Sequence, residues 1–197
     1  MSAVLAFLPQ RHRITTDEYY RMAEVGILKA VDRVELIEGE VFDMSPIGID
    51  HASVVKRLNS IFMPCVGMKA IVSVQDPIHL NEHSEPQPDI ALLHYRDDFY
   101  RQAHPRPEDI ILLVEVSDTT LRYDREVKLP LYARHAIPEV WIVDLEHQRL
   151  EVFRRPDEGV YLEMFCPNLD ETISPTGLAG ARINLRNLFI YSVFNIK

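Results

Sequence analysis

The fold is decided by three segments: QPDIALL (87–93), ILLVEVSDTT (111–120) and DREVKLPLYARHAIPEVWIVD (124–144). The first two contain short apolar runs of the length typical of buried β-strands, and the third contains a helical pattern followed by another apolar run. Asp89 and Glu115 lie at the edges of the first two runs, and Lys128 follows in the helical segment. The chain is therefore predicted to build a sheet around two acids and a lysine.

Further elements are predicted from the same periodicities. Thr15 and Glu18 form the signature of a capping box, so a helix of about 14 residues is expected to begin there and to end between residues 26 and 30. RVELIEGEVFDMSP (33–46) alternates around a Glu-Gly turn and predicts a hairpin. The other expected elements are a helix at 49–65, a strand with a bend at Pro77, a charged loop at 96–109, a helix at 124–135 in which Pro130 causes a kink or marks a short first segment, a meander of strands at 139–165 and an amphipathic segment at 183–190.

Length and composition favour one globular domain over residues 1–197. The chain is 47% hydrophobic and 26% charged, which is ordinary for a globular protein, and division into two cores becomes usual only above roughly 250 residues. It has 21 basic and 30 acidic residues and a net charge of -9. This charge argues against a protein that coats nucleic acid by bulk electrostatics, but it permits a local basic groove or a metal-neutralised acidic site.

Cysteine use and the N-terminal segment indicate a cytoplasmic protein. Cys65 and Cys166 lie far apart without zinc-site spacing, so buried free thiols in a reducing compartment are expected. The segment AVLAFLP (3–9) is too short for the apolar core of a signal peptide, and no run approaches the length of a membrane span. No membrane partner is expected.

The chemistry of the two acids points to a divalent metal. A buried, ionised carboxylate is costly unless it meets a cation or hydrogen-bond donors. If their strands are neighbours, Asp89 and Glu115 can face one point, and Mg2+ prefers such oxygen ligands. The alternatives are that Asp89 caps a turn and that Glu115 pairs with a basic residue. Lys128 either pairs with Asp124 four residues earlier or reaches a metal-bound water from a helix beside the Glu115 strand.

The order and spacing of these motifs resemble a known family. QPDIALL, LLVEVSD, the D-x3-K-x3-YA helix and IPEVWIVDL, preceded by VELIEGEVFDMSP, resemble the Uma-two family of restriction-endonuclease-like proteins, a branch of the PD-(D/E)XK nuclease superfamily. The resemblance covers about residues 15–190. It implies a mixed α/β (α+β) fold with a restriction-endonuclease-like core, in which helices flank a central mixed β-sheet, and an N-terminal helix and hairpin. It also implies magnesium-dependent cleavage of phosphodiester bonds.

The resemblance assigns the acids and the lysine of the family motif to individual residues of this chain. Asp89 matches the first acid and Glu115 the second, whereas Ser117 stands where the superfamily usually has its lysine. The resemblance places that lysine on the following helix, at Lys128. A further acid matches Glu35. The remaining positions of interest are Glu38 and Glu40 as weaker candidates for this acid, Ala136 in place of a frequent glycine and Val140 in place of a frequent aromatic residue.

These assignments give an expected mechanism. Asp89, Glu115 and the backbone carbonyl of Val116 hold one Mg2+, with Mn2+ as a possible substitute, and Glu35 assists. Lys128 orients the attacking water or helps to deprotonate it. The expected substrate is nucleic acid, DNA before RNA. Two alternatives stay open, a non-catalytic binding or assembly module and a metal-dependent hydrolase of a small phosphorylated substrate.

Other residues receive weaker functional interpretations. His51 can face the cleft, although a capping or surface role is the commoner one for such a histidine. A homodimer is expected from the resemblance, with the apolar hairpin around Trp141 as a candidate surface. Trp141 itself is expected in the core or at an interface. The remaining candidates are His79 and His83 as poor metal ligands, Tyr123 and Tyr132 for base stacking or packing, and Arg96, Arg101 and Arg106 for phosphate contact.

Overall fold

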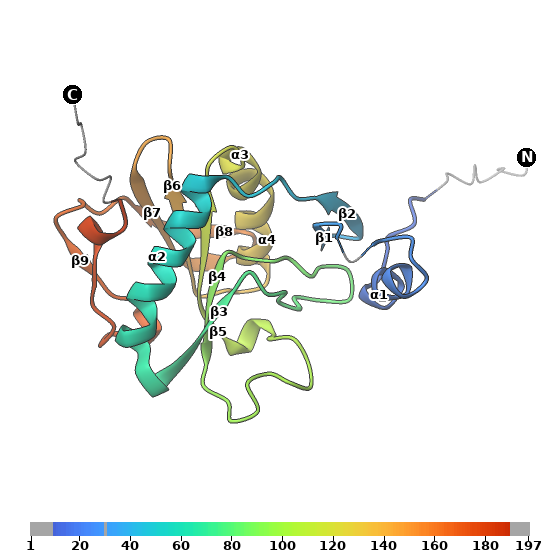
Figure 1. Ribbon diagram of the computed structural model, residues 1–197, viewed down its shortest axis with the longest axis horizontal. Helices are drawn as coiled ribbons and strands as arrows, with labels where there is room; N and C mark the ends of the chain where they lie inside the picture. The colour runs from blue at the N-terminus through green and yellow to red at the C-terminus, as the bar shows by residue number, and fades with distance from the viewer. Residues whose placement is uncertain (1–9, 30, 190–197) are drawn as a thin grey trace, which may run out of the picture.

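The computed structural model describes residues 10–29 and 31–189, and a six-stranded sheet lies at its centre (Figure 1). Along the sheet the strands follow their order in the chain, and only β5 and β6 run parallel. The strands are β3 (Ala70–Val74), β4 (Ile90–His94), β5 (Ile110–Ser117), β6 (Glu139–Asp144), β7 (Arg149–Asp157) and β8 (Val160–Phe165). This mixed sheet, with helices packed on it, confirms the expected fold class.

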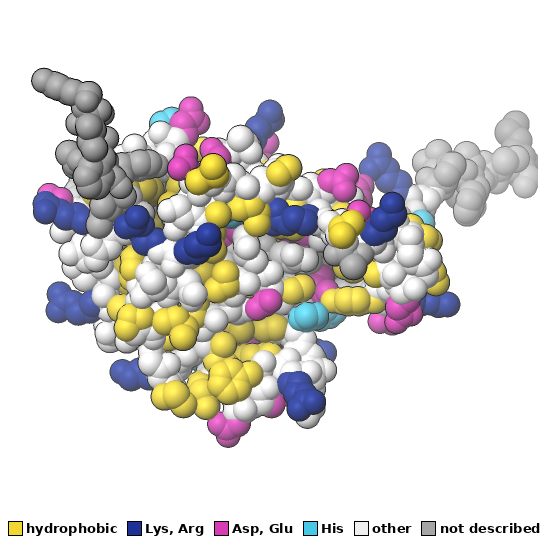
Figure 2. Space-filling view, in the orientation of Figure 1, with side chains coloured by type: hydrophobic (Ala, Val, Ile, Leu, Met, Phe, Trp, Pro, Cys, Tyr) yellow, Lys and Arg dark blue, Asp and Glu magenta, His cyan; other side chains and the backbone are white. Residues whose placement is uncertain are grey.

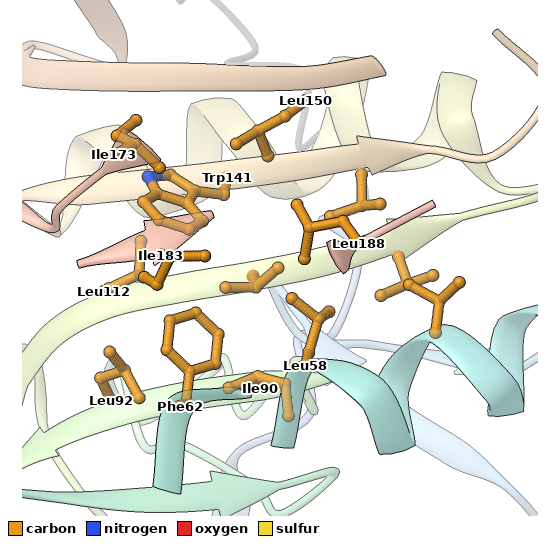
Figure 3. Packing of buried hydrophobic residues seen from close by; sticks show 14 of the residues in the cluster. Leu58, Phe62, Ile90, Leu92, Leu112, Trp141, Leu150, Ile173, Ile183 and Leu188 are labelled. Carbon is orange, nitrogen blue, oxygen red and sulfur yellow. The ribbon is translucent and has the colours of Figure 1, made fainter. Parts of the chain in front are cut away.

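Helices cover both faces of the sheet. On one face lies α2 (Ile49–Val66), whose Leu58 and Phe62 are fully buried among sheet residues such as Trp141 (Figure 3). On the other face, α4 (Leu129–Arg134) buries Tyr132 against the alternate strand positions, such as Ile142. Successive residues of a strand point to opposite faces. The continuous apolar run of β6 therefore serves two cores.

An N-terminal extension lies beside the sheet. It consists of α1 (Thr16–Glu24) and the antiparallel hairpin β1 (Val34–Ile37) and β2 (Glu40–Asp43). The capping box at Thr15 is present as expected, but α1 has 9 residues and not about 14. The helix ends early because Gly26 adopts a φ of +79°, which breaks the helical path.

The crossover helix between β5 and β6 also departs from its expected form. It begins at α3 (Leu121–Tyr123), three residues before the expected start, and passes through a π-helical turn, η3 (Asp124–Lys128), before α4. Pro130 lies in the first turn of α4, where its missing N–H and its ring are accommodated by the wider turn before it. The expected kink at Pro130 is therefore a π-helical turn.

The C-terminal segments pack with α2 in the core, through Ile173, Ile183 and Leu188. Residues 183–187 form a short strand and a short helix, and Ile190 and the segment AVLAFLP (3–9) lie outside the described residues. The short elements are η1 (Gly67–Lys69), η2 (Pro107–Asp109), β9 (Thr172–Ile173), η4 (Thr176–Leu178), β10 (Ile183–Asn184) and η5 (Leu185–Asn187). Within the described ranges, no helix is both long and apolar enough to cross a membrane.

One expectation about side chains is confirmed and one is wrong. Trp141 has an exposed fraction of 0% and packs against Phe62 of α2, so of its two expected places it takes the core and not an interface. Cys166 is exposed and not buried, because it follows the edge strand β8. Cys65 and Cys166 are both free.

The turn of the β1–β2 hairpin provides a stability prediction. Gly39 has a φ of +82°, and a Cβ there would lie 2.6 Å from the Cβ of Arg13. Gly26 has a similar φ, but a Cβ there would meet nothing within 4 Å. We expect Gly26→Ala to lower the free energy of unfolding by about 1 kcal/mol through backbone strain alone. Gly39→Ala should cost more, because strain and overlap add. Urea denaturation measures both variants, and equal losses would contradict the close packing of Arg13.

Candidate active site

A cavity of about 300 Å3 lies where the β1–β2 hairpin, the start of α2 and the α3–η3 segment meet. Figure 1 shows the chain passing from β2 to the start of α2, close to α3. The cavity wall thus combines segments that are far apart in the sequence. Its polar lining includes Arg33, Glu35, His51, Gln87, Asp89, Glu115, Asp118, Asp124 and Lys128.

A buried ion-pair network forms the floor of this cavity. Lys128 Nζ lies 3.3 Å from Glu115 Oε1 and 3.3 Å from Glu35 Oε2. Tyr132 donates its hydroxyl hydrogen to Glu115 Oε1 at 2.6 Å. Glu35, Glu115 and Lys128 have exposed fractions of only 3%, 3% and 4%. The central strand β5 and the crossover helix therefore bring the second predicted acid and the predicted lysine into direct contact.

Burial and the charges of neighbouring side chains set the pKa values of Glu115 and Lys128. Burial raises the pKa of Glu115 to about 8, although Lys128 opposes the shift. Burial alone would lower the pKa of Lys128, but the carboxylates of Glu115, Glu35 and Asp124 raise it further than burial lowers it. Lys128 is accordingly a charged ammonium, held at a fixed position by two acids.

Asp89 immediately precedes β4 and is held by three donors. Its Oδ2 accepts a hydrogen bond from the backbone N–H of Val116 at 2.9 Å and lies 3.0 Å from His51 Nε2. Its Oδ1 accepts from Gln75 Nε2 at 3.0 Å. Burial raises the pKa of Asp89, but the contact with His51 and these donors lower it below its usual value. Asp89 is therefore an ionised carboxylate of fixed orientation.

The structure separates Glu35 from the two weaker candidates for the additional acid. Glu35 lines the cavity, and its carboxylate also accepts hydrogen bonds from Tyr123 and from the backbone of Gln87. Glu38 forms the hairpin turn and pairs with an arginine outside the cavity, and Glu40 is exposed. The alternation of buried and exposed residues along a strand could not identify Glu35, because all four residues of β1 are buried.

Several residues of the site were missed or undervalued by sequence reasoning. Asp124 does not pair with Lys128 by a direct hydrogen bond; its Oδ2 accepts from Ser117 at 2.7 Å and from Thr120 at 2.8 Å. Ser117, in the place of the usual lysine, thus fixes an acid of the cavity. His51 contacts Asp89 across 38 residues of sequence, and no local pattern could reveal this.

The remaining histidine and arginine candidates lie away from the cavity. His79 contacts Glu85, and His83 contacts the backbone of Ile14. Arg96 pairs with Asp98. None of these residues, nor Arg101 and Arg106 on the same loop, lines the cavity. Of the two tyrosines, Tyr123 lines the cavity. Tyr132 does not line it; this residue is fully buried and donates its hydroxyl hydrogen to Glu115.

The donor set fits a magnesium ion in type. Glu35, Asp89, Glu115 and Asp124 supply acidic oxygens to the cavity beside Lys128 and His51, and a bound cation would favour their ionised forms. Among the described residues, no three His, Cys, Asp or Glu side chains are grouped so that they could hold a metal ion by themselves. Mg2+ commonly takes only one or two protein carboxylates, and it completes its shell with water and phosphate oxygens. Asp89 and Glu115 can supply such a pair.

Comparisons with known proteins agree with this architecture. The model of the Uma2 family, described as "Putative restriction endonuclease", matches residues 16–186. The chain belongs to the Uma2 family. The Uma2 match begins with α1 and ends within η5, so it includes every residue of the cavity. The family expected from the sequence is thereby confirmed.

A solved structure shares the fold of this Uma2 chain. It is titled "Crystal structure of a putative nuclease belonging to DUF820 from Anabaena variabilis ATCC 29413", and it is 16% identical with a TM-score of 0.68. The alignment covers 89% of this chain and 97% of that one. At this identity the likeness concerns the fold alone. No curated protein matches the chain.

Proposed function

We propose that the cavity is the active site of a Mg2+-dependent endonuclease that hydrolyses phosphodiester bonds of nucleic acid, with DNA as the preferred substrate. The observation that carries the proposal is the convergence of Asp89, Glu115 and Lys128 on one cavity from three separate elements. Membership of the Uma2 family supports the reaction class. A cytoplasmic location and a homodimer belong to the same proposal.

Each residue has a defined role in this proposal. Asp89 and Glu115, with the backbone carbonyl of Val116, would hold the metal ion. When bound, the ion lowers the pKa of a water and stabilises charge on the phosphoryl group. Lys128 presents its ammonium hydrogens to the attacking water or to a phosphate oxygen. Glu35 holds Lys128 in place through the 3.3 Å ion pair.

The first test measures metal binding and cleavage together. Purified protein is incubated with single- and double-stranded DNA and RNA in the presence of Mg2+, Mn2+ or a chelator. We expect metal-dependent cleavage by the wild type, and loss of both calorimetric Mg2+ binding and cleavage in Asp89→Asn and Glu115→Gln. Asp76→Asn makes the same chemical change at an exposed position outside the cavity and should behave as the wild type.

The same assay separates the alternatives. A non-catalytic module would bind no Mg2+ or Mn2+ in any variant, and cleavage that survives Asp89→Asn and Glu115→Gln would overturn the residue assignment. Hydrolysis of a small phosphodiester with no cleavage of any nucleic acid would favour a hydrolase of small phosphorylated substrates.

A further inference from the structure

The depth of the ion-pair network limits the form in which a substrate can reach it. Glu115 and Lys128 are almost completely buried, so a phosphodiester has to enter the cavity to contact them. In a duplex, each phosphate is held on the outside of a stiff helix with a persistence length of about 150 base pairs. A volume of about 300 Å3 lies at the lower end of the range for small-molecule pockets. The cavity therefore favours a flexible strand over a duplex.

The hairpin side of the cavity offers apolar and aromatic surface. The rings of Phe42 and Tyr123 lie 5.7 Å apart between centroids, and both residues are only partly buried. Tyr123 donates its hydroxyl hydrogen to Glu35 Oε1 at 3.2 Å, which fixes its ring beside the acids. Ile47 on the same wall exposes 43% of its surface. Aromatic rings of this kind stack on the faces of bases, and those faces are accessible only when the base is unpaired.

A second hollow adjoins the cavity. It has a volume of about 810 Å3 and shares Asp118 and Thr119 with the cavity. Arg122 and Arg125 line it, but Asp50, Glu126 and Glu146 line it too. On the face in Figure 2, basic side chains are scattered among acidic and apolar ones and form no continuous band. The hollow itself has more acids than arginines in its lining, so it offers the dense phosphate charge of a duplex little compensation.

We propose that the substrate is an unpaired strand, one nucleotide of which enters the cavity with its base against Phe42 and Tyr123 and its phosphate toward Asp89 and Glu115. This inference rests on the proposed nuclease function. It deepens that function by naming a single-stranded segment or overhang, of DNA or RNA, as the substrate class.

The experiment compares substrates of one sequence in different pairing states. A single strand, a blunt duplex and a duplex with an unpaired overhang are tested as DNA and as RNA, together with a small chromogenic phosphodiester, in Mg2+ or Mn2+. We expect the single strand and the overhang to be cleaved about tenfold faster than the blunt duplex, or more. Phe42→Ala should raise the KM for the single strand by about 5- to 150-fold. Phe99→Ala, which removes an exposed ring outside the cavity, should leave it unchanged.

The outcomes separate the two proposals. Equal or faster cleavage of the blunt duplex, or a KM in Phe42→Ala no higher than in Phe99→Ala, would overturn the unpaired-strand inference while leaving the nuclease function intact. Fluorescence anisotropy with labelled strands tests the other possibility, that the protein binds an unpaired strand without cleaving it. Absence of cleavage of every substrate, with tighter binding of the single strand than of the duplex and loss of this preference in Phe42→Ala, would reject the nuclease function and support the strand site.

Discussion

Replacement of Lys128 by methionine is expected to lower the rate of phosphodiester cleavage by about 10²- to 10⁴-fold, the usual contribution of a positioned proton donor or acceptor. Mg2+ binding should persist, because the substitution removes no oxygen ligand and takes away a cation that contacts Glu115 and Glu35. Methionine matches the unbranched apolar part of the lysine side chain but lacks the terminal ammonium, so the apolar packing around η3 is largely retained. Glu35 and Glu115 lose their buried cation, and some stability is expected to be lost with it.

Steady-state kinetics and isothermal titration calorimetry provide the two measurements for this variant. Lys56→Met makes the same change on the exposed side of α2 and serves as the control. A variant with lost Mg2+ binding and native circular dichroism would show that Lys128 supports the ligands and not the reaction. Unchanged cleavage would remove Lys128 from the mechanism altogether.

The second large effect concerns stability and lies outside the cavity. Glu139 has an exposed fraction of 0%, and its carboxylate accepts hydrogen bonds from Trp141 Nε1 at 2.6 Å, from Arg154 at 2.9 Å and from the backbone N–H of Thr176 at 2.7 Å. Glu139→Ala would leave the buried indole N–H and the arginine without their acceptor. We expect the free energy of unfolding to fall by about 3–5 kcal/mol, as when one partner of a buried ion pair is removed.

Urea denaturation of Glu139→Ala tests this expectation. Glu24→Ala makes the same change at the end of α1, where the side chain is exposed, and should cost less than about 0.5 kcal/mol. Glu139→Gln retains an acceptor for Trp141, so its loss of unfolding free energy should fall between those of the two alanine variants. Equal stability of the two alanine variants would show that the network around Glu139 contributes little.

The two strand acids could be predicted because they are exceptions in otherwise apolar runs. Asp89 directly precedes a buried strand and Glu115 lies within one, and a buried carboxylate needs a cation or a hydrogen-bond donor as its partner. Lys128 was predicted from the spacing of the following helix and from the family resemblance. The structure brings the three residues into one cavity, as the sequence suggested, and leaves their roles to the experiments above.

What the sequence could not provide depends on contacts between distant segments. The contact of His51 with Asp89 requires that α2 begin above the start of β4, which no local periodicity encodes. The choice of Glu35 depends on its contacts with Lys128, Tyr123 and the backbone of Gln87, which come from segments distant in the sequence. In a regular α-helix, residues four apart such as Asp124 and Lys128 would lie side by side and could pair. Here Asp124–Lys128 form a π-helical turn, and Asp124 accepts a hydrogen bond from Ser117 and not from Lys128.

The division of the pair Glu115 and Lys128 between a strand and a helix makes the site sensitive to insertions and deletions. One residue added or removed between Ser117 and Asp124 would rotate the helix by about 100° about its axis and turn the lysine away from the cavity. A lysine on the strand itself would keep its spacing from the acid through any change in the crossover. The length of the segment between β5 and η3 is thus as strict a requirement as the identity of the residues it connects.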